Sequence, residues 1–287
     1  MAWAGTGEQG RGMDGFRRDG MVFDVRDGGP PDGAPVVLLH GFPQDSTAWD
    51  GVAPGLHAAG LRTLAPDQRG YSPSARPTGR SAYRLRELTD DVLALLDAAG
   101  LASAHVVGHD WGGLVGWALG AWHPDRVRTL TALSVPHPGA MARAMVTSDQ
   151  ALRSSYIGLI QLPLLPERLI LAGNGAALRR TLTEGGLPDD TVDSYVRRMQ
   201  EPGALSPALA WYRALPWIAR DPVGRVRVPT LHVWSTGDAY LGRAATEDTA
   251  RFVAAPYRLE VLDHVSHWIP ELAPDRTAEL VTAHVRG

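Results

Sequence analysis

The 287-residue chain contains no cysteine, and this absence excludes several kinds of chemistry. Without thiols there is no disulfide scaffold, no thiolate metal site and no cysteine nucleophile. Lysine is absent too, so all 28 basic residues are arginine. Chemistry that needs a lysine amine, such as Schiff-base formation or a phosphate-binding P-loop, is therefore excluded. No run reaches the roughly 18 consecutive apolar residues of a membrane-spanning helix, and we expect a cytoplasmic protein without membrane contact.

What is present is an ordinary globular composition, with 44% hydrophobic and 21% charged residues. The net charge of −3 gives no electropositive footprint for nucleic acid. No glycine-rich dinucleotide fingerprint follows the first strand, and no histidine–glutamate spacing indicates a metal site. We therefore expect no cofactor, no metal and no nucleic-acid partner. The sequence leaves a homodimer open.

Short apolar, β-branched runs alternate with longer helical patterns along most of the chain. This alternation predicts an α/β fold with a mostly parallel sheet and helices on both faces. The expected strands are Met21–Val25, Pro35–His40, Leu61–Ala65, Ala104–Gly108, Val127–Leu133, Thr230–Ser235 and Tyr257–Leu262. The expected helices are Ser46–Ala59, Leu85–Ala99, Trp111–Trp122, Gly242–Phe252 and Pro274–Val285.

The alternation stops in the middle of the chain, where helical periods and prolines occur without a clear strand. A segment of roughly 80 residues is too long for a structureless loop. We therefore expect a helical cap, or lid, inserted at 138–225, with the core formed by 21–137 and 226–287. Residues 1–20 are glycine-rich and are expected to form a flexible N-terminal extension.

The sharpest local signal is the sequence Gly-His-Asp-Trp-Gly at 108–112, which follows a buried strand and opens a helix. Small residues two before and two after the central residue permit a very tight strand-to-helix turn. Such a turn exposes one side chain at the carboxyl end of the sheet, and here that residue is Asp110. An aspartate is ionised at neutral pH without help from a base. It can displace a leaving group or open a strained ring at a saturated carbon, which leaves an alkyl ester on the enzyme.

Hydrolysis of such an ester needs an oxyanion hole and a base. The backbone N–H groups of Phe42, in a turn after a strand, and of Trp111 can form the oxyanion hole. His267 lies just past the last expected strand and is the expected base, with His264 as the alternative. Asp238, also beyond the carboxyl end of a strand, is expected to orient the histidine. The order Asp110, Asp238, His267 matches the nucleophile–acid–histidine order of α/β-hydrolases.

With these residues in place, the sequence resembles the soluble, cap-bearing epoxide hydrolases of the α/β-hydrolase fold, which use an Asp nucleophile. The resemblance spans nearly the whole chain, from about Met21 to Val285. The matching motifs are HGFPQ (His40–Gln44), DQRGYS (Asp67–Ser72), GHDWGG (Gly108–Gly113), Gly237-Asp238 and SHWIP (Ser266–Pro270).

The resemblance also implies two cap tyrosines that face the nucleophile. Tyr212 lies in a matching Trp-Tyr-Arg element, and Tyr156 stands five residues before Gln161. Two phenols can hydrogen-bond and protonate the alkoxide that forms when an epoxide opens. Together with Phe42 and Trp111 they are expected to line the substrate site. Nearby apolar residues favour a small hydrophobic epoxide; they are Leu159, Ile160, Leu162, Leu164 and Leu165.

Three other functions compete with this one. A haloalkane dehalogenase uses the same Asp–His–Asp machinery, but it usually takes a second halide donor from the position that Phe42 occupies here. A serine esterase is disfavoured because Asp110 stands where its serine would be. A non-catalytic binding protein on this fold would tolerate the loss of a catalytic residue. The residues present favour epoxide hydrolysis to a vicinal diol over all three.

Overall fold

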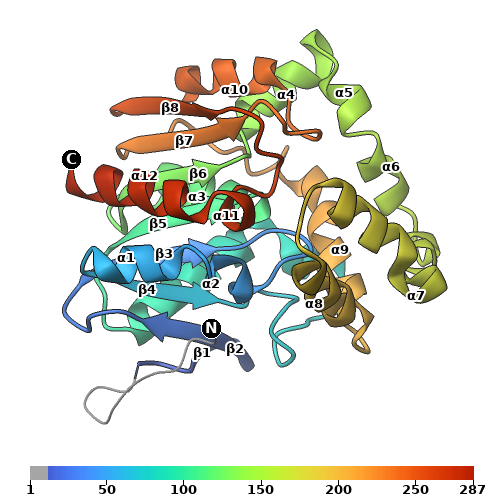
Figure 1. The fold of residues 1–287 in the computed structure, drawn as a ribbon, viewed down its shortest axis with the longest axis horizontal. Helices are drawn as coiled ribbons and strands as arrows, with labels where there is room; N and C mark the ends of the chain where they lie inside the picture. The colour runs from blue at the N-terminus through green and yellow to red at the C-terminus, as the bar shows by residue number, and fades with distance from the viewer. Residues whose placement is uncertain (1–11) are drawn as a thin grey trace.

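The structure is a computed structural model that describes residues 12–287, and it contains one eight-stranded sheet (Figure 1). The strands are β1 (Gly15–Arg18), β2 (Met21–Gly28), β3 (Ala34–Leu39), β4 (Leu61–Pro66), β5 (Ala104–His109), β6 (Val127–Leu133), β7 (Thr230–Ser235) and β8 (Tyr257–Leu262). Their order across the sheet is β1-β2-β4-β3-β5-β6-β7-β8. The pairs β1–β2 and β2–β4 are antiparallel, and every later pair is parallel. The predicted α/β-hydrolase architecture is confirmed.

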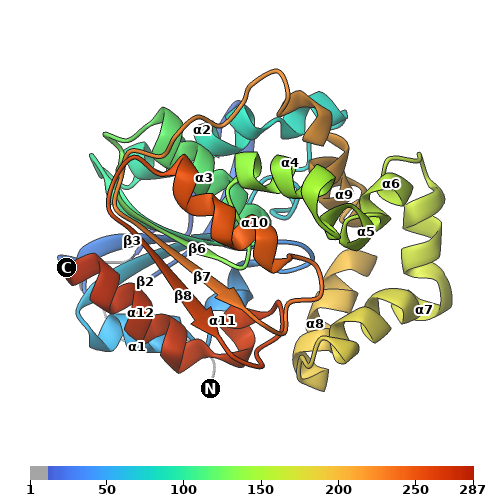
Figure 2. The same cartoon turned by 90° about the horizontal axis from the view of Figure 1, so that it is seen from above.

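Helices connect the parallel strands and cover both faces of the sheet. They are α1 (Ala53–Ala58), α2 (Leu85–Ala98), α3 (Trp111–Trp122), α4 (Pro138–Thr147), α5 (Gln150–Arg153), α6 (Tyr156–Ile160), α7 (Leu165–Glu184), α8 (Asp189–Gln200), α9 (Leu205–Arg213), α10 (Arg243–Asp248), α11 (Ile269–Leu272) and α12 (Pro274–Arg286). Figure 2 shows α1 and α12 on one face, with α2, α3 and α10 on the other.

The central strand β3 shows how one sheet serves two hydrophobic cores. Successive side chains of a strand point to opposite faces. Val36 and Leu38 accordingly pack in the core under α1 and α12, whereas Val37 and Leu39 pack in the core under α2 and α3. All four side chains are fully buried. A strand covered on both faces needs no polar alternation, which explains its continuous apolar sequence.

The segment expected to be one helix over Ser46–Ala59 is divided, so that expectation is wrong in detail. A 3₁₀ turn at Ser46–Trp49 is capped by Asp45, whose side chain accepts a hydrogen bond from the Thr47 N–H. The helix α1 then begins at Ala53 with a proline in its first turn. Proline has no N–H to donate and restricts the residue before it, which favours a new helix start over continuation.

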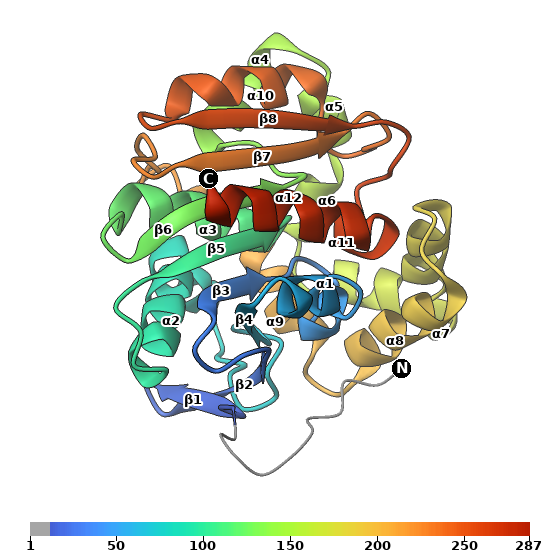
Figure 3. The same cartoon turned by 60° about the vertical axis from the view of Figure 1, so that its left-hand side comes forward.

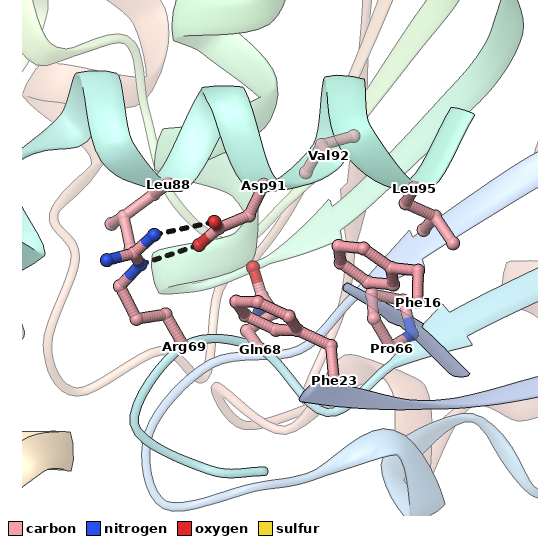
Figure 4. A pocket seen from close by; sticks show the side chains of 9 residues that line it. All are labelled: Phe16, Phe23, Pro66, Gln68, Arg69, Leu88, Asp91, Val92 and Leu95. Atoms are coloured by element: carbon pink, nitrogen blue, oxygen red, sulfur yellow. Dashed lines mark hydrogen bonds and ion pairs between the residues drawn. The ribbon is translucent and has the colours of Figure 1, made fainter. Parts of the chain in front are cut away.

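The expected flexible extension over 1–20 is also wrong in part, because Gly15–Arg18 form the edge strand β1. Residues 1–11 lie outside the described residues. The ring of Phe16 stacks on Phe23 of β2 with centroids 4.6 Å apart. Figure 4 shows both rings beneath α2, next to the ion pair between Arg69 and Asp91. Arg18 also reaches Asp91, at 2.8 Å, so apolar packing and charge together hold β1 against the core.

Between β6 and β7 the chain forms the helices α4 to α9 and no strand. Figure 3 shows α7 and α8 packed together beyond one end of the sheet. Helix α7 is interrupted at residues 172–175, where three successive residues have positive φ. Within residues 12–287, no helix is both long and apolar enough to cross a membrane.

We expect Phe16→Ala to destabilise the protein by about 3 kcal/mol, because it removes a buried aromatic ring and leaves a cavity. Chemical denaturation monitored by circular dichroism measures this loss. Arg17→Ala is the matched control, since Arg17 is exposed on the other side of the same strand, and it should change stability by less than about 0.5 kcal/mol. Equal stability of the two variants would show that β1 does not contribute to the folded core.

Candidate active site

The turn between β5 and α3 presents Asp110 above the sheet. Its backbone adopts φ 50° and ψ −120°, an unusual conformation for a residue with a side chain. A Cβ added at Gly108 would lie 2.2 Å from the Gly112 carbonyl oxygen, and one at Gly112 would lie 2.1 Å from the Leu39 carbonyl oxygen. Only glycine fits at both positions, so the glycine spacing read from the sequence is a steric requirement.

Backbone donors surround the Asp110 carboxylate. The Phe42 N–H donates to Oδ1 at 3.1 Å, and the Trp111 N–H also hydrogen-bonds the carboxylate. The Gly41 backbone lies so close that a Cβ there would be 2.4 Å from Oδ1. Burial opposes ionisation of Asp110, but hydrogen bonding and the charge of His267 lower its pKa below the ordinary value. The carboxylate is therefore ionised, and two backbone N–H groups hydrogen-bond it.

His267 stands between two carboxylates. Its Nδ1 lies 2.8 Å from Asp238 Oδ2, and its Nε2 lies 3.5 Å from Asp110 Oδ2. Asp238 is held in turn by the N–H groups of Tyr240 and Leu241, at 2.8 and 2.9 Å. Burial would lower the pKa of His267, but the charge of Asp238 and hydrogen bonds to both carboxylates raise it to about 10. The two neighbouring acids therefore favour the protonated form of this histidine.

These groups meet because each follows a strand of the parallel part of the sheet. Asp110 follows β5, Phe42 lies beyond β3, Asp238 beyond β7 and His267 beyond β8. The carboxyl ends of parallel strands lie at one edge, which is where open α/β sheets place their ligand sites. These residues are far apart in the sequence, but the topology of the sheet brings them close together in space.

The inserted helices supply two tyrosines above this edge. Tyr212 of α9 packs edge-on against Trp111 and Phe42, with centroid distances of 4.8 and 5.7 Å. Tyr156 of α6 lies 6.2 Å from Tyr212 by the same measure. Gln161 donates to the Tyr212 carbonyl at 2.8 Å and so ties the two segments together. Burial and the charge of Asp110 raise the pKa of both hydroxyls, which therefore stay protonated at neutral pH.

Two apolar cavities meet at Asp110, Tyr156 and Tyr212. One, of about 750 Å³, extends beneath α4 and α6. The other, of about 420 Å³, extends beneath α7 and includes His267. Leu159 and Ile160 line the smaller cavity as the sequence suggested. The other three leucines that the sequence suggested near the substrate are exposed and line neither cavity; they are Leu162, Leu164 and Leu165.

All seven predicted site residues come together in the structure, and the alternative base does not. His264 is exposed in the loop before His267. His40 ties its loop down, accepting from the Gln68 N–H at 3.1 Å. Sequence reasoning missed Tyr240, which lines the smaller cavity with its ring 5.1 Å from that of His267. Tyr240 stands two residues after Asp238 in the sequence, and this proximity to a predicted site residue could have indicated it.

Comparisons with known proteins agree with this fold. Residues 34–274 match the α/β-hydrolase fold family model, and the chain belongs to that family. It is 34% identical to the AB hydrolase superfamily protein YfhM of Bacillus subtilis, over 94% of this chain and 96% of that protein. It is 33% identical to epoxide hydrolase A of Mycobacterium tuberculosis, over 94% of this chain and 95% of that protein. The resemblance read from the motifs is confirmed.

A similar structure is the crystal structure of epoxide hydrolase A from Mycobacterium thermoresistibile. It superimposes with a TM-score of 0.82 at 26% identity, over 95% of this chain and 97% of that chain. The similarity therefore covers both the sheet and the inserted helices, and not the sheet alone.

We expect Asp110→Asn to lower the pKa of His267, because it removes one of the two negative charges that stabilise the imidazolium. The pKa in the unmodified protein is raised to about 10, so the ring should stay protonated through neutral pH. Titration of the ¹⁵N-labelled imidazole by NMR measures both values. Asp263→Asn, at an exposed acid on the same loop, is the control and should leave the pKa in place. The idea fails if Asp110→Asn behaves like this control.

Proposed function

We propose that this protein hydrolyses epoxides to vicinal diols through a covalent ester on Asp110. The observation that carries the proposal is the meeting of four kinds of group at one point: an ionised carboxylate, two backbone donors, a histidine–aspartate pair and two phenols. Epoxide opening needs a nucleophile for carbon and an acid for oxygen. The relatives named epoxide hydrolases support the same assignment.

In the first step Asp110 attacks one ring carbon of the epoxide, and the carbon–oxygen bond at that carbon breaks. Tyr156 and Tyr212 hydrogen-bond the departing oxygen, and one of them donates its proton to the alkoxide. The raised pKa of these hydroxyls keeps them protonated before the reaction. Trp111 and Phe42 pack beside Tyr212 and help to enclose the reacting centre in apolar surroundings.

In the second step water hydrolyses the ester. Alkylation neutralises Asp110, so His267 loses one of its two charged neighbours and its pKa falls. The imidazolium then gives up its proton, which returns to the tyrosinate left by the first step. The neutral ring takes a proton from water while Asp238 stabilises the imidazolium that forms again. The hydroxide adds to the ester carbonyl carbon, the bond from that carbon to the substrate oxygen breaks, and this oxygen takes the proton from His267 as the diol leaves. Asp110 is left as the acid and returns its proton to His267, which restores the starting state. The N–H groups of Phe42 and Trp111 both hydrogen-bond the Asp110 carboxylate, Phe42 at Oδ1, and we assign them the stabilisation of the oxyanion that develops there. The charge on the nucleophile thus controls when the base becomes available.

We further propose that 138–225 act as the cap of a core formed by 21–137 and 226–287. The cap carries both tyrosines, so the site is complete only when cap and core are together. The cavities have mostly apolar linings, which suits a small hydrophobic epoxide. Halide release is less well supported, because the Phe42 side chain offers no donor for a departing halide.

We expect diol from at least one member of a small panel of styrene-type and aliphatic epoxides, measured by chromatography. Asp110→Ala should abolish it, because no other carboxylate in the site can form the ester. Diol from the wild type but not from this variant supports the reaction. If no panel member yields diol with either protein, the next measurement is halide release from haloalkanes.

We expect His267→Gln to stop the reaction after the first step. Glutamine cannot take a proton from water, so ester hydrolysis should slow by about 10²–10⁴-fold while alkylation of Asp110 continues. Intact-protein mass spectrometry should then show one added substrate mass, located at Asp110 by peptide mapping. Absence of this adduct, with a substrate that the wild type turns over, would falsify the two-step scheme.

A further inference from the structure

A chain of polar side chains, partly exposed at Glu271 and buried beyond it, runs from Glu271 to the active site, and the proposed reaction does not use it. Glu271, on α11, accepts hydrogen bonds at Oε1 from the Gln44 amide at 2.7 Å and from the Tyr195 hydroxyl at 2.8 Å. Gln44 Oε1 in turn accepts from the Gly41 N–H at 2.8 Å and contacts His109 Nδ1 at 2.8 Å. Gln44 and His109 are fully buried.

This chain contacts the reaction site at two places. Gly41 lies against the Asp110 carboxylate, and the next residue, Phe42, provides an N–H to Oδ1. The other nitrogen of His109 lies 2.9 Å from the backbone oxygen of His267. Burial lowers the pKa of His109 to about 4, and a neutral imidazole has one N–H, so His109 can donate to only one of these two oxygens. Gln44 and His109 still lie in contact between the loop that holds Phe42 and the loop that holds His267.

The orientation of the Gln44 amide decides whether this link works. Its two ends have almost the same shape, so only their partners select between them. The Gly41 N–H needs an acceptor, and Glu271 Oε1 accepts from the other end of the Gln44 amide. Both requirements place oxygen toward Gly41 and nitrogen toward Glu271. An apolar residue at 271 would leave the Gln44 amide N–H without an acceptor. It would also no longer favour one orientation of the amide over the other.

We propose that Glu271 is a positioning residue that, through Gln44, holds the Gly41–Phe42 backbone against Asp110. This inference rests on the proposed function for its effect on rate, but not for the contacts themselves. Glu271 touches no reacting atom. Its second oxygen, Oε2, is buried without a hydrogen-bond partner among the described residues, so burying this carboxyl is unfavourable. Holding Gln44 in one orientation is the benefit we assign to it.

Glu271→Leu removes the acceptor, and Glu271→Gln keeps one. We expect the leucine variant to hydrolyse the Asp110 ester about tenfold more slowly, since misplacement of a catalytic group by about 1 Å can cost as much as 10²-fold. Alkylation should change less, because Phe42 N–H acts on the charge that develops during hydrolysis. The glutamine variant should remain within about twofold of wild type. Rapid quenching followed by mass spectrometry separates the two steps.

Tyr195→Phe is the matched control, because it removes the other hydrogen bond to Glu271 Oε1 and leaves Gln44 in place. It should not change the ratio of the two steps. Hydrogen–deuterium exchange of the loop at residues 40–44 gives a readout that needs no substrate. The exchange rate of this loop should rise in Glu271→Leu. It should stay at the wild-type value in Glu271→Gln and in Tyr195→Phe. A folded leucine variant with wild-type exchange would overturn the proposal, even if the protein proves to have another activity.

Exchanging the two residues tests the orientation of the hydrogen bond directly. Gln44→Glu alone places two carboxylates at hydrogen-bond distance, so we expect faster loop exchange and slower ester hydrolysis. The double variant Gln44→Glu with Glu271→Gln again pairs one amide with one carboxylate. The amide at position 271 now donates the hydrogen bond, and the carboxylate at position 44 accepts it. It should recover slow exchange and most of the rate. A double variant no better than Gln44→Glu alone, in both measurements, would reject the positioning role.

Discussion

The structure of this site depends on the backbone turn at Asp110. A residue with a side chain takes φ 50° there, in a region that favours glycine, and the neighbouring glycines at 108 and 112 allow backbone contacts that no Cβ could enter. The turn brings the start of α3 against the end of β3, and so brings Asp110, the proposed nucleophile, next to the Phe42 N–H. Every other functional group is placed relative to this contact.

Charge then links the groups that the turn has brought together. His267 lies between Asp238 and Asp110, and its pKa is raised to about 10 by these two neighbours. A base that is protonated at rest cannot act until the nucleophile has lost its charge. In the mechanism we propose, the order of the two chemical steps therefore follows from the electrostatics of three side chains, and a separate conformational switch is not required. The mostly apolar linings of the two cavities strengthen these interactions, because they offer few polar groups to screen the charges.

Much of the fold could be predicted because its signals are local. The buried strands are continuous apolar runs, and their alternation with helices indicates a parallel sheet. The one missed strand has no such local signal. The edge strand Gly15–Arg18 has a glycine and two arginines, so nothing in its composition separates it from a loop. It is ordered by stacking of Phe16 on Phe23 and by the pairing of Arg18 with Asp91, which are contacts across long chain separations.

The sequence by itself was enough to select the residues that we propose as nucleophile, acid and base, because glycine spacing and strand ends are local features of the chain. Tertiary structure alone decided which side chains surround them. Tyr240 entered the site because Asp238 holds its backbone N–H. Glu271 contacts Gln44 across more than two hundred residues. Such contacts depend on how the sheet and the inserted helices pack, and no periodicity in the sequence reports them.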